Sequence, residues 1–495
     1  MILLAAVPLL YPPVPPLVDL LGHMGRYRVE LDLAKSSDLQ RYWDFKWALI
    51  GNLGVDLLII PFAKVFGLEL GVKLIVLAIP PMTVAGFLWV AREVHLRIPP
   101  TALFALPFAY GHPFLFGFVN FSLSMALAFL AFGLWLRLAR LGRLRLRAAL
   151  FIPISLMIFI THAFGWGVLG LLCYSAEAVR QHDRGRTWWS AGLHAATHAA
   201  ALGLPLVLML LWRSETGIQG GTTFDWFNLQ AKLYWLVTAL RDRWRLFDIL
   251  SVTVPLVVLV FVLIHDNLGF SRNLAFSTVV LVVGFMLLPR VIFGSAYADM
   301  RLMPFILAVT LLAVRFRTQT ELPTARLLAS VALAFIIVRT AGTTLSLGIA
   351  ANHQRVQFQA LNHVARGTRV LSLAGQPCIV RVARWTLARN SHLGSMAIVR
   401  RDAFENSQWE ISGANLLRVK NPGNYRGFSA DPSQFVVPEG CGGAGKSLDS
   451  VLATLPRDAF DYLWLIDPPA YDRRLVAGMQ LVWSKGGDAL YRIHP

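Results

Sequence analysis

Three ionisable residues near the start of the chain are spaced so that one face of a helix would carry all of them. The stretch from Val14 to Arg26 reads VPPLVDLLGHMGR and places Asp19, His23 and Arg26 at offsets of four and three. On a helix, these offsets stack side chains one above another. A carboxylate takes a proton from an attacking hydroxyl or holds a divalent cation, and a guanidinium pairs with phosphate oxygens. The pattern predicts a site for an anionic substrate; the alternative is a helix cap followed by a solvated turn.

The composition of the chain indicates that this stretch lies beside a membrane. Hydrophobic residues make up 56% and charged residues 15% of the sequence, and the mean hydropathy is +0.56. A soluble domain is about half apolar and a quarter charged. The apolar excess fills residues 1–350 and then stops. We therefore expect a polytopic α-helical membrane domain over 1–350 and a small soluble domain over 351–495.

Apolar runs predict about eleven transmembrane helices. Met1–Leu10 is shorter than the roughly 20 residues that a span needs, and we interpret it as a short or truncated first helix. Spans are expected at about 70–91, 100–118, 120–138, 147–162, 164–179, 190–212, 248–265, 273–290, 301–316 and 326–350. The two short runs between 147 and 179 are alternatively one helix broken near Gly165 and Gly167.

The positive charge of the chain, +18, follows the links between the apolar runs. The arginines of these links are Arg92, Arg97, Arg137, Arg140, Arg143, Arg145, Arg147, Arg180, Arg184, Arg186, Arg315, Arg317 and Arg326. This is the positive-inside pattern of membrane proteins, so we expect no nucleic-acid partner. If the arginine-rich links face the cytoplasm, the alternating links of an eleven-span protein lie outside. These outer segments are a first loop at 19–69, residues 111–119, 162–165, 213–247 and 291–300, and the tail.

With this topology, most ionisable residues near apolar segments fall on the outer side. They are Asp19, His23, Arg26, Asp56, His112, His162, Arg290, Asp299 and Arg301. Because charge near hydrocarbon is costly, such residues tend to be functional, and this group predicts a phosphate-bearing, lipid-linked substrate. His194 and His198 are spaced like metal ligands near the inner side, but without an evident third ligand we favour packing. Residues 222–246 predict either an interfacial amphipathic helix or a plain connecting helix.

The tail has the pattern of an α/β domain. Its expected elements are strands at Thr368–Ala374, Cys378–Val382 and Phe460–Ile466, a helix at 470–479 and a terminal hairpin turning at 485–488. Cys378 and Cys441 both lie in the tail, where they form a disulfide or remain two thiols. Cys173, inside an apolar run, is expected to be buried packing.

One motif in the tail matches a nucleotide-binding pattern. Residues 440–447 read GCGGAGKS, the full P-loop pattern, and Asp467 ends a later apolar strand as a Walker B aspartate would. The spacing to Asp467 leaves little room for a βαβ crossover, the domain is small, and parity places it outside the cell. We interpret the motif as a glycine-rich turn before a helix and expect no bound nucleotide.

The order of these features resembles the integral-membrane glycosyltransferases of the GT-C type, which use polyprenyl-phosphate sugars. PPLVDLLGHMGR is similar to the D-x-x-x-H-x-x-R element that opens the first outer loop of bacterial members. Trp47–Leu58, Phe116–Leu123 and Gly294–Leu302 resemble later landmarks of that family. The likeness covers most of the chain by layout and few positions in detail.

The resemblance implies an inverting transfer of a sugar from a polyprenyl-phosphate donor to an acceptor hydroxyl. Asp19 would be the general base or a metal ligand, and His23 would assist it. The implied substrate- and phosphate-binding residues are Arg26, Arg301, His112, His162, Arg290 and Asp299, with Arg301 first for the leaving phosphate. A divalent cation is a possible cofactor, although the acid nearest Asp19 is Glu30, whereas many members carry paired acids.

The implied location is the bacterial cytoplasmic (inner) membrane, with several passes and an extracytoplasmic C-terminal domain. The acceptor would be a glycan, a lipid or a protein. Alternative functions are a transporter or flippase, or a ligase, for lipid-linked glycans, and a non-enzymatic assembly subunit. A transporter predicts internal repeats and charges near the middle of the membrane. We find no repeat in the sequence, and the charges gather at one face.

Overall fold

The computed structural model describes residues 1–216, 222–317, 322–378, 385–410, 415–441 and 445–494. The chain divides into two compact units. Unit 1 comprises Met1–Tyr11, Leu49–Leu57 and Ile75–Leu345, and unit 2 comprises Pro12–Ala48, Leu58–Leu74 and Ser346–Pro495. Unit 2 is therefore assembled from segments that are far apart in the sequence, and the first loop, apart from Leu49–Leu57, belongs to it together with the tail.

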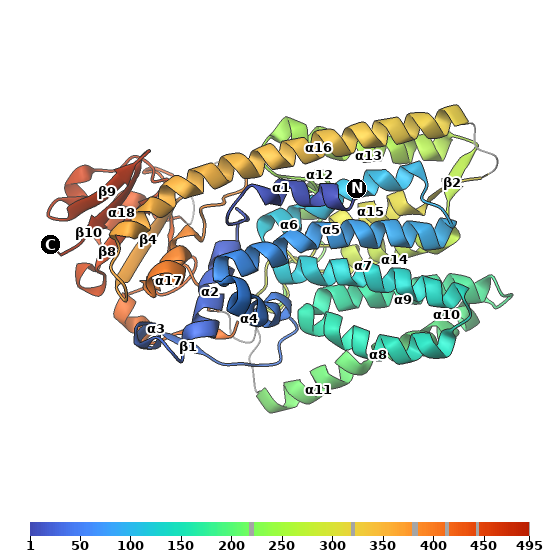
Figure 1. Cartoon of the computed structure of the whole chain (residues 1–495), viewed down its shortest axis with the longest axis horizontal. Coiled ribbons are helices and arrows are strands. Elements are labelled where there is room, and N and C mark those ends of the chain that lie inside the picture. Colours follow the sequence, from blue (N-terminus) through green and yellow to red (C-terminus); the bar gives the residue numbers. More distant parts are fainter. Residues whose placement is uncertain (217–221, 318–321, 379–384, 411–414, 442–444, 495) are drawn as a thin grey trace. The chain divides into compact units, whose positions relative to one another are not determined.

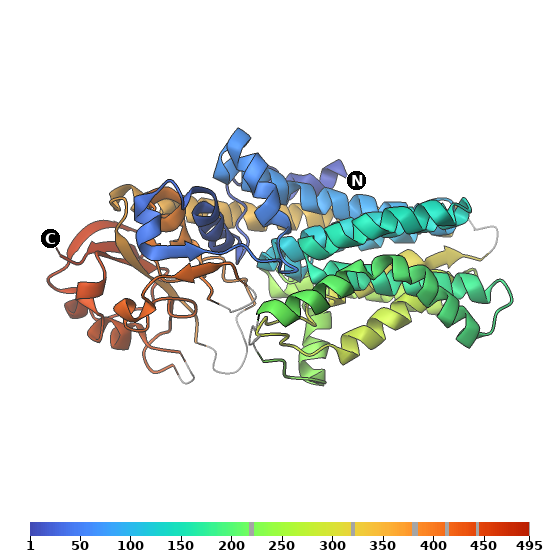
Figure 2. The same cartoon turned by 90° about the horizontal axis from the view of Figure 1, so that it is seen from below.

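Unit 1 is built from long apolar helices, several of which run side by side in both views (Figures 1 and 2). The helices that form it or extend into it are η1 (Leu3–Ala6), α1 (Val7–Leu10), α4 (Gly54–Phe66), α5 (Leu68–His95), η2 (Pro100–Tyr110), α6 (His112–Phe116), α7 (Val119–Arg140), α8 (Leu144–Thr161), α9 (Ala163–His182), α10 (Trp188–Ala199), η3 (Ala200–Leu202), α11 (Leu204–Thr216), α12 (Leu229–Val237), α13 (Arg245–Ile264), α14 (Arg272–Leu287), α15 (Met303–Ala313) and α16 (Leu322–Gln357). Strands β2 (Leu268–Phe270) and β3 (Val314–Phe316) pair antiparallel.

The described residues contain five helices that are long and apolar enough to cross a membrane, namely α5, α7, α8, α13 and α16. A sixth span results if the pair formed by Trp188–Leu202 and Leu204–Leu210, bent by 67°, is counted as one. The protein is thus a multi-pass membrane protein, and the predicted fold class, a polytopic helical protein with a small C-terminal α/β part, is confirmed. The predicted number of about eleven spans is not confirmed.

Proline explains why one predicted span is wrong. Residues 100–118 form the 3-10 helix η2 and the short helix α6 in place of one long α-helix. Pro107 lies inside η2, and Pro113 lies in the first turn of α6. Because proline lacks an amide hydrogen and clashes with the preceding turn, it interrupts an α-helix. Gly117, with φ of +100°, ends α6 in the left-handed conformation.

The run between 147 and 179 forms two helices, as the parity argument requires. The chain breaks at His162, between α8 and α9, and not at the glycines. Near the other end of this pair, Arg147 Nη1 lies 2.9 Å from Glu177 Oε2. A contact between the start of α8 and the last turns of α9 means that the two helices are antiparallel.

The arginine-rich links gather at one end of unit 1. Glu93, at the end of α5, accepts hydrogen bonds from Arg137 and Arg140 of the next link. In the link after α9, Asp183 lies 2.6 Å from Arg272, which begins α14. These contacts confirm that links far apart in the sequence share one end, which the charge pattern predicts. We call it the basic end.

The expected amphipathic helix at 222–246 is shorter than predicted. Leu229–Val237 form the helix α12, and the stretch ends where α13 begins, at Arg245. Lys232 does not extend toward solvent or lipid phosphate: it is 4% exposed, and its Nζ donates to the carbonyls of Phe285 and Leu288 at 2.7 and 2.9 Å. Buried carbonyls therefore satisfy its donors, which agrees with a connecting helix better than with an interfacial one.

Unit 2 contains a six-stranded mixed sheet. The strand order is β5-β4-β8-β10-β9, and β7 also pairs with β4. The strands are β4 (Arg369–Gly375), β5 (Phe404–Glu405), β7 (Phe435–Val436), β8 (Tyr462–Ile466), β9 (Gln480–Lys485) and β10 (Asp488–Arg492). β4 pairs parallel with β8, and β8 and β9 pair antiparallel with β10. β8 reads YLWLI and is buried throughout, as expected of a central strand.

The first loop contributes to the core of unit 2. It forms α2 (Leu20–Asp32), α3 (Ser37–Tyr42) and β1 (Trp43–Phe45), and β1 pairs with β6 (Leu417–Val419). The indole of Trp43 is fully buried and stacks on Phe404, with ring centroids 5.5 Å apart. Burial of such a side chain contributes roughly 1.5–3 kcal/mol.

The remaining helices of unit 2 are short. They are η4 (Phe358–His363), η5 (Leu393–Ser395), α17 (Met396–Arg401), η6 (Pro422–Tyr425), α18 (Leu448–Ala453), η7 (Arg457–Ala459) and η8 (Arg473–Val476).

The tail agrees with most of its predicted elements. β4, β8 and the β9–β10 hairpin lie where they are expected, whereas the helix predicted at 470–479 is only the 3-10 turn η8. The strand predicted at Cys378–Val382 lies mostly outside the described residues. Cys378 and Cys441 form a disulfide, and Cys173 is a buried free cysteine.

The P-loop-like motif belongs to a turn that folds back on the preceding strand. Val437 bonds to the carbonyl of Lys446 and accepts from Leu448, and Ser447 caps the six-residue helix α18. Residues 442–444 lie outside the described part. The described residues agree with a glycine-containing turn before a short helix.

Candidate active site

Asp19 occupies the N-cap position of α2. Its backbone has φ of −90° and ψ of −11°, and its side chain makes no capping hydrogen bond to the helix among the described residues. The carboxylate is 13% exposed, so solvent or a small substrate can reach it. The partial positive charge at a helix N-terminus favours an ionised carboxylate. Asp19 therefore has the position of a helix cap without performing that role.

His392 is the residue that the structure adds to this site. Its Nε2 lies 3.9 Å from Asp19 Oδ1, and its Nδ1 lies 2.9 Å from the carbonyl oxygen of Ser407. Burial lowers the pKa of His392, against the opposing effects of Asp431 and the Ser407 carbonyl. At neutral pH the imidazole is therefore neutral. A neutral imidazole bonded to a carbonyl must donate from Nδ1, which leaves the lone pair of Nε2 facing the Asp19 carboxylate.

Trp409 packs against both histidines of the site. Its ring centroid lies 5.1 Å from that of His23 and 4.2 Å from that of His392. Burial, followed by the charge of Arg26, lowers the pKa of His23 well below its usual value. Gly22 allows this close packing, because a Cβ at this position would lie 2.6 Å from the Trp409 ring. His23 and His392 thus pack on the same indole, and His392 faces Asp19.

Arg26 lies further along α2 and is largely buried, at 4% exposure. Its guanidinium lies over the ring of Tyr27, 5.3 Å from the centroid. Gln408 fixes the helix beside it by donating to the carbonyl of Gly22 at 3.1 Å and to Ser395 Oγ at 2.8 Å. The predicted face with Asp19, His23 and Arg26 therefore packs into unit 2.

A metal at Asp19 has little support from the ligands present. Asp19 and His392 supply one oxygen and one nitrogen donor. Among the described residues, no third histidine, cysteine or acid joins them in a group spaced for one ion. Both groups can instead accept a proton, so the arrangement fits a base better than a metal site.

The other candidate residues lie in unit 1. Asp56 is buried, and its Oδ2 accepts from Asn120 Nδ2 at 2.9 Å. Asn120 also bonds to Asn52 and accepts from the amide of Val55 at 2.6 Å. The side chain of Asn120 thus joins two of the later landmarks, Trp47–Leu58 and Phe116–Leu123. Sequence reasoning did not single out this residue.

The third landmark meets the same region through Arg301, which is 9% exposed. Its guanidinium carbon lies 4.3 Å from the centroid of the Phe118 ring, and its Nη2 donates to Ser295 Oγ at 3.1 Å. Arg301 precedes α15, since that helix begins at Met303 and not at the predicted 301. A guanidinium with an aromatic wall and a hydroxyl partner is suited to phosphate.

His112 and His162 differ in their surroundings. His112 is buried beside Trp235, with ring centroids 6.3 Å apart, and neither ring nitrogen has a hydrogen-bond partner among the described residues. His162 is the N-cap of α9, and its Nδ1 accepts from the amide of Phe164 at 3.1 Å. His162 therefore has a local structural role, whereas the described structure gives none to the His112 ring nitrogens.

Arg290 and Asp299 are held by other charges. Arg290 Nε lies 2.9 Å from Asp225, and Asp299 Oδ2 lies 3.6 Å from the buried Lys232. Of the two histidines spaced like metal ligands near the basic end, His198 lies 3.7 Å from Glu177 and His194 bonds to its own helix at Ser190. The histidine pair therefore takes part in packing, as expected.

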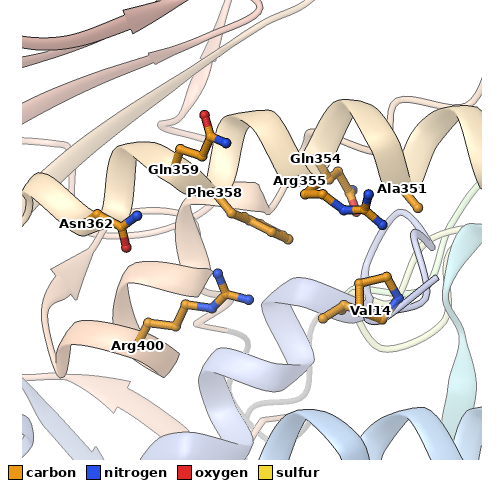
Figure 3. Close-up of a pocket in the computed structure, with 9 residues that line it drawn as sticks. Val14, Ala351, Gln354, Arg355, Phe358, Gln359, Asn362 and Arg400 are labelled. Atoms are coloured by element: carbon orange, nitrogen blue, oxygen red, sulfur yellow. The ribbon is translucent and has the colours of Figure 1, made fainter.

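A polar cavity lies in unit 2 beside the segment that leads into Asp19 (Figure 3). Its volume is about 230 Å³, and Val14, Gln354, Arg355, Phe358 and Arg400 are among its lining residues. The guanidinium of Arg400 lies over the Phe358 ring and is held by Glu69 at 2.8 and 2.9 Å. The cavity offers guanidinium and amide groups to a polar ligand.

No protein-family model matches the sequence, and no curated protein matches it. Among solved structures, the chain is similar to the crystal structure of ArnT from Cupriavidus metallidurans bound to undecaprenyl phosphate. The TM-score is 0.49 and the identity 10%, over 99% of this chain and 96% of that chain.

Proposed function

We propose that the protein is a membrane glycosyltransferase that moves a sugar from a polyprenyl-phosphate donor to an acceptor hydroxyl. One observation carries the proposal: the partly exposed carboxylate of Asp19 stands beside the imidazole of His392, at 3.9 Å. The D-x-x-x-H-x-x-R element and the multi-pass fold support the same reading.

In the proposed reaction, Asp19 is the general base. The acceptor oxygen attacks the anomeric carbon and forms the new C–O bond, while the bond from that carbon to the phosphate oxygen breaks. The electron pair leaves with the polyprenyl phosphate, and the acceptor proton passes to Asp19. Attack from the side opposite the leaving phosphate inverts the configuration. General-base assistance of this kind contributes about 10²- to 10⁴-fold in rate.

His392 positions the base in this proposal. Its Nε2 lone pair raises the local electron density beside Asp19 and favours uptake of the acceptor proton, which the two groups then share. Trp409 holds the ring against rotation, together with the bond from Nδ1 to Ser407. His23, neutral because burial lowers its pKa, packs on the same indole without adding charge.

We assign Arg301 to the leaving phosphate, because its guanidinium is buried against aromatic rings, where charge interactions are strong. Arg26 and His112 are secondary candidates for binding the donor. Arg290, Asp299 and His162 would support that region through their contacts with Asp225, Lys232 and the α9 terminus.

We place the reaction outside the cytoplasm of a bacterial cell, at the inner membrane, with unit 2 on the outer side. The disulfide between Cys378 and Cys441 supports this side, because disulfides persist in oxidising compartments. The acceptor is a glycan, a lipid or a protein that presents a hydroxyl there. Protease access to a tag after Pro495 from outside spheroplasts is the expected result, and access from the cytoplasm alone contradicts it.

The function is tested by incubating the purified protein in nanodiscs with polyprenyl-phosphate sugars and measuring sugar transfer or release. We expect Asp19→Asn to lose at least 10²-fold in rate. Asp44→Asn is the matched control, since Asp44 lies in the same loop, is 57% exposed and pairs with Lys420. Full activity in Asp19→Asn refutes the proposed base. If the wild-type protein turns over no lipid-linked sugar, the proposed glycosyltransferase function is refuted.

A further inference from the structure

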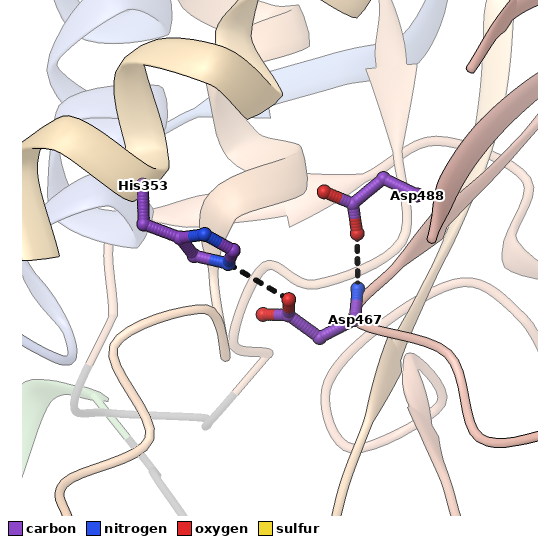
Figure 4. Close-up of side chains that lie close together, drawn as sticks. All are labelled: His353, Asp467 and Asp488. Atoms are coloured by element: carbon purple, nitrogen blue, oxygen red, sulfur yellow. Dashed lines mark hydrogen bonds and ion pairs between the residues drawn. The ribbon is translucent and has the colours of Figure 1, made fainter. Parts of the chain in front are cut away.

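A second group of ligand-type side chains lies in unit 2, formed by residues that the proposed reaction does not use. His353, Asp467 and Asp488 come from three different elements: α16, the residue after β8 and the first residue of β10 (Figure 4). One ligand atom from each lies within 4.8 Å of the others. A cation with ligand distances of about 2.0–2.5 Å spans ligand pairs up to roughly 4–5 Å apart.

The side chains of this group are already oriented toward one another. His353 Nε2 lies 2.8 Å from Asp467 Oδ1, and Asn390 Nδ2 donates to Asp467 Oδ2 at 2.9 Å. Asp488 Oδ1 accepts from the amide of Asp467 at 2.5 Å. The side chains of His353 and Asp467 are 52% and 36% exposed, so an ion can enter from solvent.

Gln357 provides an independent indication of a missing ligand. It follows His353 by one turn of α16 and is fully buried. Its amide is close enough to both carboxylates to lower their pKa. Its Nε2 faces these carboxylates, whereas none of the described residues gives its Oε1 a hydrogen bond. Because a buried amide oxygen without a partner costs about 1–3 kcal/mol, its retention beside two carboxylates indicates an absent partner.

The charges in this group also favour a cation. Asp488 is buried, and its carboxylate lies close to that of Asp467, within the 4.8 Å that encloses the group. Two adjacent carboxylates repel each other when both are ionised. A divalent cation removes this repulsion, and the Gln357 amide then has a partner for its oxygen.

We propose that His353, Asp467 and Asp488 bind a divalent cation, with the amide oxygen of Gln357 as a fourth ligand. The single imidazole among oxygen donors favours Zn²⁺ or Mn²⁺ over Mg²⁺ and Ca²⁺. The ion would fasten the last turns of α16 to strands β8 and β10. Its role is structural, and it is distinct from any ion at Asp19.

The test uses the full-length protein in detergent micelles, stripped with a chelator and titrated calorimetrically with ZnCl₂ and with MnCl₂. We expect one equivalent to bind and to raise the unfolding temperature. His353→Ala and Asp467→Asn should each weaken binding at least 10-fold. His363→Ala, an exposed histidine in the following turn η4, should leave it unchanged.

Two further variants make the outcome decisive. Gln357→Leu should weaken binding about 10-fold without removing charge, and Asp19→Asn should bind the same equivalent as the wild type. Pulsed EPR of the Mn²⁺ complex should show coupling to one imidazole nitrogen, which tests the site even if a variant fails to fold. Absence of saturable binding for both metals, or equal binding in His353→Ala, overturns the proposal, as does loss of the equivalent in Asp19→Asn.

Discussion

Glu177 and Asp19 are both shielded carboxylates, yet their surroundings differ in kind. Glu177, 1% exposed at the basic end of unit 1, accepts from Arg147, Arg180 and Gln181. Asp19 is 13% exposed, at a helix terminus that it does not cap, beside imidazoles kept neutral by burial. Guanidinium and amide donors surround the first carboxylate, whereas the second is partly open to solvent. The comparison separates a carboxylate that holds the fold from one that the proposed reaction uses as its base.

The largest effect on stability is expected at Glu177. Glu177→Ala leaves the guanidinium of Arg147, itself 1% exposed, without its partner. Removal of one member of a buried ion pair costs about 3–5 kcal/mol. We expect this loss of unfolding free energy in detergent, with sugar transfer per folded molecule unchanged. Glu69→Ala is the control, because the Glu69–Arg400 pair is about one-third exposed and should contribute under about 1 kcal/mol.

The second effect, on rate, is expected at His392. His392→Gln keeps a side chain able to donate to the Ser407 carbonyl but removes the basic lone pair beside Asp19. We expect kcat to fall about 100-fold, equivalent to roughly 2.7 kcal/mol in the barrier, with KM changed less than threefold. A thermal unfolding curve like that of the wild type should accompany the loss. If kcat stays within twofold of the wild type, His392 has only a packing role.

The pH dependence of stability should also distinguish the surroundings of Asp19, through His392, from those of Glu177. Burial lowers the pKa of His392, so the unfolded chain takes up a proton near pH 6.5 that the folded chain still refuses. The stabilisation from the neutral ring is complete above pH 6.5 and declines as the pH falls toward the folded pKa. The slope is at most about 1.4 kcal/mol per pH unit. Between pH 7 and 5, His392→Gln should therefore lose less unfolding free energy than the wild type. Glu177→Gln is the control and should not reduce the pH slope. Both are measured in denaturation series at matched ionic strength.

The smallest effect is expected at the surface of the basic end. Arg272 and Asp183 are 58% and 46% exposed and 2.6 Å apart. Exposed pairs contribute about 0.2–1 kcal/mol and are screened by salt. Arg272→Ala should therefore change the unfolding free energy by less than about 1 kcal/mol, and less still in high salt. A loss above 2 kcal/mol would mean that even exposed pairs at this end carry the fold.

The order and approximate bounds of the helices were largely predictable, because hydropathy and charge are properties of local stretches of sequence. The sequence predicts α7, α8, α9, α13 and α14 close to their observed bounds, and the arginine links predict their shared end. The run at 100–118 was misread because its apolar residues outweighed the three prolines, which decide the backbone. The burial of Lys232 was not predictable, because helix periodicity does not reveal which face meets carbonyls.

The candidate site was predictable only in part. Asp19, His23 and Arg26 are recognisable because their spacing is local. His392 and Trp409 reach Asp19 through the fold of unit 2, and nothing in the tail sequence alone pairs them with the first loop. The stretch NSHLGS around His392, with a buried glycine and two buried serines, was the available signal. Its meaning depends on contacts that connect the beginning of the chain to its end.

That connection has a consequence for how the protein is made. Strand β1 and helix α2 are synthesised early, but β6 and the His392 region emerge only after every membrane helix. At about 5–20 residues per second, synthesis of the intervening chain takes on the order of half a minute. During that time the Trp43 face and the Gly22 face have no partner from the tail. Expression of the tail as a separate fragment would leave β6 without β1, so the intact chain is the form in which the candidate site can assemble.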